Sequence, residues 1–122
     1  MPKGTCLMRL QNSLSEKLLR YDVFASNAVW NQQPPMTVEA GASSGNFQLS
    51  YNYQDSGQAD FHMRYSIHGA PTQVFTAAGI IETDPETHAV TLTPSGAGPG
   101  AHTVSWNVTG AHPHFFVLFT FN

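Results

Sequence analysis

The chain has 122 residues, which is enough for one domain with one hydrophobic core. Charged residues are scarce, with five Lys or Arg against eight Asp or Glu, and the net charge is −3. The absence of a basic cluster argues against nucleic-acid binding. No apolar stretch reaches the roughly 20 residues that a membrane-spanning helix needs, and the first residues lack the apolar segment of a signal peptide. We therefore expect one soluble domain over residues 1–122, either cytoplasmic or exported without a recognisable signal peptide.

Short β-type runs follow one another along the chain, about 8–12 residues apart, which is typical of all-β proteins. Clusters of Gly, Pro, Asn and Ser separate most of these runs. Ser13 and Glu16 imitate a helix capping box, but a strand pattern resumes by Tyr21, so we expect at most one helical turn there. The pattern predicts an all-β, single-domain antiparallel β-sandwich of about eight or nine strands with little or no helix. The expected strands lie near residues 5–12, 18–26, 36–40, 46–54, 59–68, 72–82, 87–93, 102–109 and 114–121.

Polar and apolar residues alternate in two neighbouring stretches, residues 46–53 and 60–67. Residues directly opposite each other in an antiparallel pair share a face. A hairpin with the three-residue loop Asp55-Ser56-Gly57 would place all the apolar residues on one face, and Gly57 suits the left-handed position of such a loop. The sequence thus predicts one continuous polar face on this hairpin. The implied pairs are Phe47 with Tyr65, Leu49 with Met63, Tyr51 with Phe61, Asn46 with Ser66, Gln48 with Arg64, Ser50 with His62, and Asn52 with Asp60.

The last two expected strands differ in character. Residues 114–121 (HFFVLFTF) are apolar on both faces, which indicates a strand that is buried on both sides or lies central in a sheet and is covered outside. Residues 102–108 alternate, and we expect Val104, Trp106 and Val108 to point into the core.

No catalytic signature is present in the sequence. Cys6 falls in the first expected strand, where a small buried thiol is the natural interpretation. His112 and His114 would project to the same side about 6–7 Å apart if extended, which can chelate a metal, but no acidic ligand follows them. We therefore predict no metal, no cofactor and no catalytic residue.

Trp30 lies in a proline-bounded loop next to amide side chains. Its ring could plug the end of the sandwich, or it could stack on a sugar or lie in a lipid interface, since the indole is apolar with one donor. Neutral amides and hydroxyls suit sugar hydroxyls, which both donate and accept. The same residues could also serve only to keep exposed strands in water. The candidate ligand-binding residues are Trp30, Asn31, Gln32, Gln48, Ser50, His62 and Arg64.

The first half of the chain resembles the small β-sandwich proteins typified by aegerolysins and, more distantly, actinoporins. The resemblance rests on Asn12-Ser13 at the end of a first strand, the loop residue Trp30, and the Pro35 to Gly41 strand, followed by a glycine-turn hairpin with an aromatic strand. It implies binding to membrane lipids or glycans, with Trp30 as the contact residue. The second half departs from both families, and pore formation is not implied.

These observations leave three hypotheses from different classes. The first is a non-enzymatic, lectin-like or cytolysin-like binding module for a glycan or lipid headgroup. The second is a homo-oligomer that assembles through the polar hairpin face or the apolar C-terminal strand. The third is a small enzyme with His62 as a base and Arg64 nearby.

Overall fold

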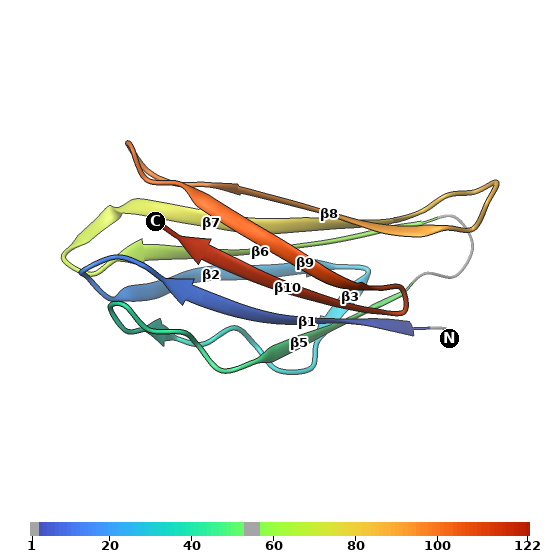
Figure 1. Ribbon diagram of the computed structural model, residues 1–122, viewed down its shortest axis with the longest axis horizontal. Helices are drawn as coiled ribbons and strands as arrows, with labels where there is room; N and C mark the ends of the chain where they lie inside the picture. The colour runs from blue at the N-terminus through green and yellow to red at the C-terminus, as the bar shows by residue number, and fades with distance from the viewer. Residues whose placement is uncertain (1–2, 53–56) are drawn as a thin grey trace.

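The structure, a computed structural model, describes residues 3–52 and 57–122 (Figure 1). These two ranges contain strands and no helix, so the expected all-β class is confirmed. The strands are β1 (Lys3–Asn12), β2 (Leu18–Ser26), β3 (Ala28–Trp30), β4 (Thr37–Val38), β5 (Phe47–Asn52), β6 (Gln58–Ile67), β7 (Ala70–Thr83), β8 (Val90–Ala97), β9 (Val104–Ala111) and β10 (His114–Phe121).

The strands form two packed sheets of five strands each. Sheet A has the order β3-β5-β1-β10-β9, and sheet B has the order β4-β2-β6-β7-β8. All neighbours are antiparallel except β1 and β10, the first and last strands, which run parallel at the centre of sheet A. The short strand β3 was expected to be a loop, and it brings Trp30 to the edge of sheet A.

The core lies between the sheets and is built by the alternation of the strands. On β5, Phe47, Leu49 and Tyr51 are buried while the residues between them are half-buried. Cys6 on β1 is fully buried, and burial raises the pKa of its thiol to about 12. The other fully buried large side chains are Met8, Leu10, Leu18, Phe61, Met63, Tyr65, Phe75, Val117, Phe119 and Phe121.

The expected hairpin between residues 46–54 and 59–68 is wrong, because the two strands belong to different sheets. β5 pairs with β1 and β3, whereas β6 pairs with β2 and β7. Their apolar faces meet across the core instead of lying side by side. Alternation shows which side chains point inward, but it does not tell a hydrogen-bonded neighbour from a partner in the facing sheet. Of the proposed loop, Asp55 and Ser56 lie outside the described residues.

The C-terminal strand is central, as predicted, since β10 lies between β1 and β9. Its inner face is buried, and Phe116 and Leu118 on its outer face are half-buried. The inward direction predicted for Trp106 is confirmed, but its burial in the core is not. It does point to the inner side, opposite the buried Phe119, but β9 is an edge strand and Trp106 remains 43% exposed.

The connection between β1 and β2 contains no helical turn. The fully buried side chain of Asn12 organises it instead. The Asn12 amide nitrogen donates to the carbonyls of Glu16 at 2.9 Å and Val38 at 3.1 Å, and its Oδ1 accepts from the Leu14 N–H at 2.9 Å. A buried amide satisfied in this way fixes the loop that starts β2.

Candidate functional site

The predicted site residues fall on opposite sides of the sandwich, because β5 and β6 are in different sheets. Asn31, Gln48 and Ser50 come together at the outer face of sheet A. Asn31 Oδ1 accepts from Gln48 Nε2 at 3.2 Å and from Ser50 Oγ at 2.6 Å. Gln32 is exposed, and its backbone N–H donates to the Gln48 carbonyl at 3.2 Å. These groups satisfy one another, which leaves fewer of them available to a ligand.

Trp30 is half-buried and points inward. Its ring packs against Phe47 at 6.2 Å and edge-on against Phe61 at 6.0 Å between ring centroids. Its Nε1 is shielded from solvent and has no hydrogen-bond partner among the described residues. Of the three roles considered for this ring, its position corresponds to closing the end of the sandwich.

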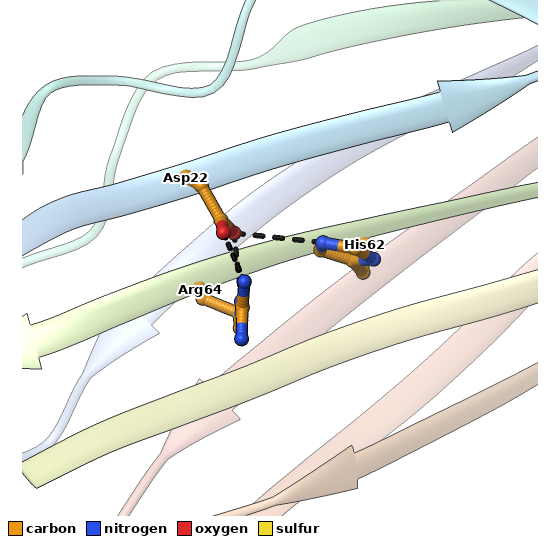
Figure 2. Close-up of polar contacts among 3 residues, drawn as sticks. All are labelled: Asp22, His62 and Arg64. Atoms are coloured by element: carbon orange, nitrogen blue, oxygen red, sulfur yellow. Dashed lines mark hydrogen bonds and ion pairs between the residues drawn. The ribbon is translucent and has the colours of Figure 1, made fainter.

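His62 and Arg64 lie on the outer face of sheet B, where they meet a residue that sequence reasoning missed, Asp22 (Figure 2). Arg64 stands directly opposite Asp22 in the β2–β6 ladder. Its Nε donates to Asp22 Oδ1 at 2.8 Å, and a second guanidinium nitrogen contacts Oδ2. His62 Nε2 lies 3.5 Å from Asp22 Oδ1. The Asp22 carboxylate is thus shared by a guanidinium and an imidazole.

Asp22 and Arg64 each stabilise the charged form of the other. The hydrogen bond from Arg64 is the main cause that lowers the pKa of Asp22, and the same bond is the main cause that raises the pKa of Arg64. Arg64 also lies over the ring of Tyr21, 5.2 Å from its centroid. Tyr21 occupies the bulge in β2 between Arg20 and Asp22. The bulge turns an exposed ring toward the same surface as the charged pair.

The next row of the sheet carries an exposed aromatic ring. Phe24 pairs directly with His62, and the two rings stack with centroids 5.2 Å apart and planes 17° apart. Phe24 is nevertheless 47% exposed. In the same cross-strand row, Ala78 on β7 lies directly opposite His62, and Ser95 on β8 lies directly opposite Ala78. Because the Ala78 side chain is small, the outer surface of the sheet is depressed between His62 and Ser95.

A shallow hollow of about 220 Å³ forms at this low point on the outer face of sheet B. The stacked rings form one wall, while Ile80, 38% exposed, adds an apolar group beside Asp60. The lining residues are Phe24, Asp60, Phe61, His62, Ala78, Gly79, Ile80 and Ser95. The hollow therefore combines an aromatic wall with a carboxylate, an imidazole and a hydroxyl.

Asp60 lines the hollow with a carboxylate oxygen that has no hydrogen-bond partner among the described residues. Its Oδ1 is shielded from solvent and receives no hydrogen bond within the described parts of the chain. Over the same residues no cation lies within ion-pair distance of this carboxylate, in contrast to Asp22. A shielded, unpaired carboxylate oxygen costs free energy. An unpartnered buried group of this kind calls for an explanation, such as a bound water or ion, a strained position or a functional role.

The candidate site residues predicted from the sequence did not include Tyr21, Asp22, Phe24 or Asp60, although the predicted polar face carried Asp60 together with His62 and Arg64. A signal was present for Phe24. Within residues 22–25, Phe24 alternates onto the same side of the strand as the polar Asp22, while Val23 and Ala25 lie on the opposite side. An aromatic residue on the solvent side of a strand is a candidate contact residue. Which strands would lie beside β2 could not be read from that pattern.

The remaining histidine pair is engaged in local contacts. His112 Nδ1 lies 2.8 Å from the Tyr51 hydroxyl, and His114 Nδ1 lies 2.8 Å from Thr5 Oγ1. Among the residues that the structure describes, no three His, Cys, Asp or Glu side chains are grouped so as to hold a metal ion. No helix in this part of the chain is long and apolar enough to cross a membrane.

Comparison with known proteins adds no family to this description. No protein-family model matches the chain. No curated protein matches it significantly either. The resemblance to aegerolysins and actinoporins therefore stays a prediction.

Proposed function

We propose that the protein is a non-enzymatic binding module that recognises a glycan in the hollow on the outer face of sheet B. The observation that carries this proposal is the exposed, stacked ring of Phe24 beside the Asp60 carboxylate, which lines the hollow and makes no ion pair within the described residues. Sugar rings offer an apolar face that packs on an aromatic ring and hydroxyl groups that donate to carboxylates. One ligand could thus satisfy both features at once.

The other polar groups of the hollow support the same ligand class. Ser95 carries a hydroxyl that can donate and accept, and the His62 imidazole is held in place by Phe24 on its face and Asp22 at its Nε2. A ligand gains affinity from groups that are already positioned before it binds. The Asp22–Arg64 pair, anchored on two strands, therefore acts as a support for the binding surface.

A glycan fits this surface better than a membrane lipid headgroup does. Proteins that bind lipid surfaces usually present basic residues together with protruding apolar groups. Here the unpaired charge of the hollow is the Asp60 carboxylate, the chain carries a net charge of −3, and Arg64 is engaged by Asp22. A lipid ligand remains an outcome that the binding experiment below can reveal.

A small enzyme with His62 as a base is the alternative that the His62–Asp22 contact favours. Two features argue for binding instead. The Asp22 carboxylate is already held by two contacts from Arg64, and the hollow is shallow and open to water. Acid–base catalysis usually takes place in a sheltered site. Turnover of a bound glycan that disappears in His62→Gln would favour the enzyme.

The experiment is a glycan array probed in parallel with liposome pelleting, using wild type, Asp60→Asn and Glu82→Gln. The two variants remove one negative charge each from the outer face of the same sheet, but Glu82 does not line the hollow. A hydrogen bond to a charged group contributes about 1.5–3 kcal/mol, so Asp60→Asn should weaken glycan binding roughly 10- to 100-fold. Glu82→Gln should bind like wild type.

Thermal unfolding of the same variants separates binding from folding. Asp60→Asn should melt at the same temperature as wild type or higher, because it removes a charge that the folded state leaves unpaired. Equal glycan binding by wild type and Asp60→Asn would contradict the proposed site. Binding to liposomes alone would replace the glycan by a lipid.

A further inference from the structure

The two sheets leave four edge strands, and these differ in how well they are protected against pairing with another chain. Within the described residues, β3 and β9 are the edges of sheet A, and β4 and β8 are the edges of sheet B. β3 has three residues and β4 has two, so both offer few free backbone groups. β8 and β9 have eight residues each. Long exposed edges are the ones that recruit further strands unless proline, charge or a bulge blocks them.

β8 is blocked by Pro94. The Asp84 N–H points to the β8 side of β7 and donates to the Ala89 carbonyl, whereas the Thr83 N–H points to the β6 side and donates to the Gly57 carbonyl. In an antiparallel ladder these directions alternate. Gly79, which stands opposite Pro94, therefore bonds toward β6, and the nitrogen of Pro94 faces the free edge. Because proline has no N–H, the middle of this edge lacks a donor.

β9 has no such block. Thr103 and Asn122 exchange two backbone hydrogen bonds, at 3.1 and 2.9 Å. By alternation Ser105, Asn107 and Thr109 bond to β10, and the N–H and C=O groups of the residues between them point to the free edge. The strand (VSWNVTGA) contains neither a charged residue nor proline. Its free edge can therefore accept another strand along its middle.

The side chains of β9 are complementary to those of a second β9. Two antiparallel copies centred on Asn107 place Trp106 opposite Val108 of the second copy on the inner side. The same register places Ser105 opposite Thr109 of the second copy on the outer side. Apolar and polar residues thus match on both faces, and aromatic–β-branched pairs stabilise antiparallel strands. No charge lies near the two-fold axis to repel its counterpart.

The inner position of Trp106 also fits a partner strand. It is 43% exposed although it points to the core side of sheet A. β8 and β9 lie close together where Val104 meets Gly96, and they diverge along β9 away from their connecting loop (Figure 1). The edge next to Trp106 is therefore not covered by the facing sheet.

We infer that β9 is a self-association edge, at which two copies of the chain pair antiparallel around a two-fold axis at Asn107 and join their A sheets into one. The occupant is a second copy, since the match of side chains described above is a match of β9 with itself. The inference does not depend on the ligand of sheet B.

Sedimentation velocity across a dilution series tests the association. Wild type should sediment as a dimer that dissociates on dilution. Trp106→Lys places an inward-pointing charge on the edge, the device that natural edge strands use against pairing, and should sediment as a monomer. Thr91→Lys adds the same charge at an exposed position of β8, away from this edge, and should remain dimeric. Circular dichroism establishes that each variant is folded.

Disulfide trapping tests the register and does not depend on the folding of Trp106→Lys. In the proposed register Asn107 faces its own copy at a non-hydrogen-bonded pair, where Cβ atoms lie at the short end of the about 4.5–5.5 Å range of cross-strand pairs, close to the about 3.5–4.5 Å that a disulfide spans. Asn107→Cys should therefore form a covalent dimer on oxidation, while Thr91→Cys, exposed on β8, should not. The native Cys6 is buried and does not compete. A wild type that is monomeric at every concentration, a dimer that persists in Trp106→Lys, or equal cross-linking of the two cysteine variants would overturn the inference.

Discussion

Replacing Phe24 by alanine tests the aromatic wall of the hollow. Phe24 is 47% exposed and contacts His62 through a parallel stack. An aromatic side chain has about 200 Å² of surface, so about 90 Å² of this ring is accessible, and a sugar packed on one face covers roughly half of it. At about 25 cal/mol per Å² this contact contributes about 1 kcal/mol.

The expected loss of about 1 kcal/mol corresponds to a roughly 5-fold weaker Kd. Isothermal titration with a soluble oligosaccharide selected on the array measures it. Val29→Ala is the matched control, because Val29 is 56% exposed on the outer face of sheet A. It should bind like wild type. An unchanged Kd in Phe24→Ala, or an equal loss in Val29→Ala, would refute the assignment of the ring to the ligand.

Two further predictions concern groups outside the hollow. Burial, and to a lesser extent His114, lowers the pKa of His112 below its ordinary value of 6.5, so the unfolded chain takes up this proton first as the pH falls. The contribution of His112 to the free energy of unfolding should therefore be largest above pH 6.5. It should decline as the pH falls from 6.5 toward the pKa of His112 in the folded protein. Urea denaturation at several pH values can measure this decline. His112→Gln should make this decline less steep, whereas the control His88→Gln, at an exposed position, should leave it unchanged. An equally steep decline in both variants would show that His112 is not its cause. Cys6, with its pKa raised to about 12 by burial, should react with a thiol reagent at neutral pH only after unfolding, so rapid modification of the native protein would show that the first strand is less enclosed than described.

The parts of the fold that follow from local alternation were predicted correctly. A strand turns successive side chains to opposite sides, so residues 47–51 and 59–65 reveal their buried members without knowledge of any partner. The turn residues gave most of the strand limits for the same reason, because glycine and proline act on their own backbone. The central position of β10 was one of two alternatives that its sequence left open, and its outer face, with Phe116 and Leu118 half-buried, is less covered than the apolar pattern predicted.

The tertiary structure decided which strands lie next to each other, and the binding surface depends on that choice. Gln48 and His62 were assigned to one face because two alternating stretches were close in sequence, whereas the folded chain puts them on opposite sides of the sandwich. Asp22 meets Arg64 only because β2 pairs with β6 across 42 residues of chain. Trp106 is exposed because β9 is an edge. Side-chain direction is a property of each residue's own backbone, but the neighbours of a strand are selected by the packing of the whole core.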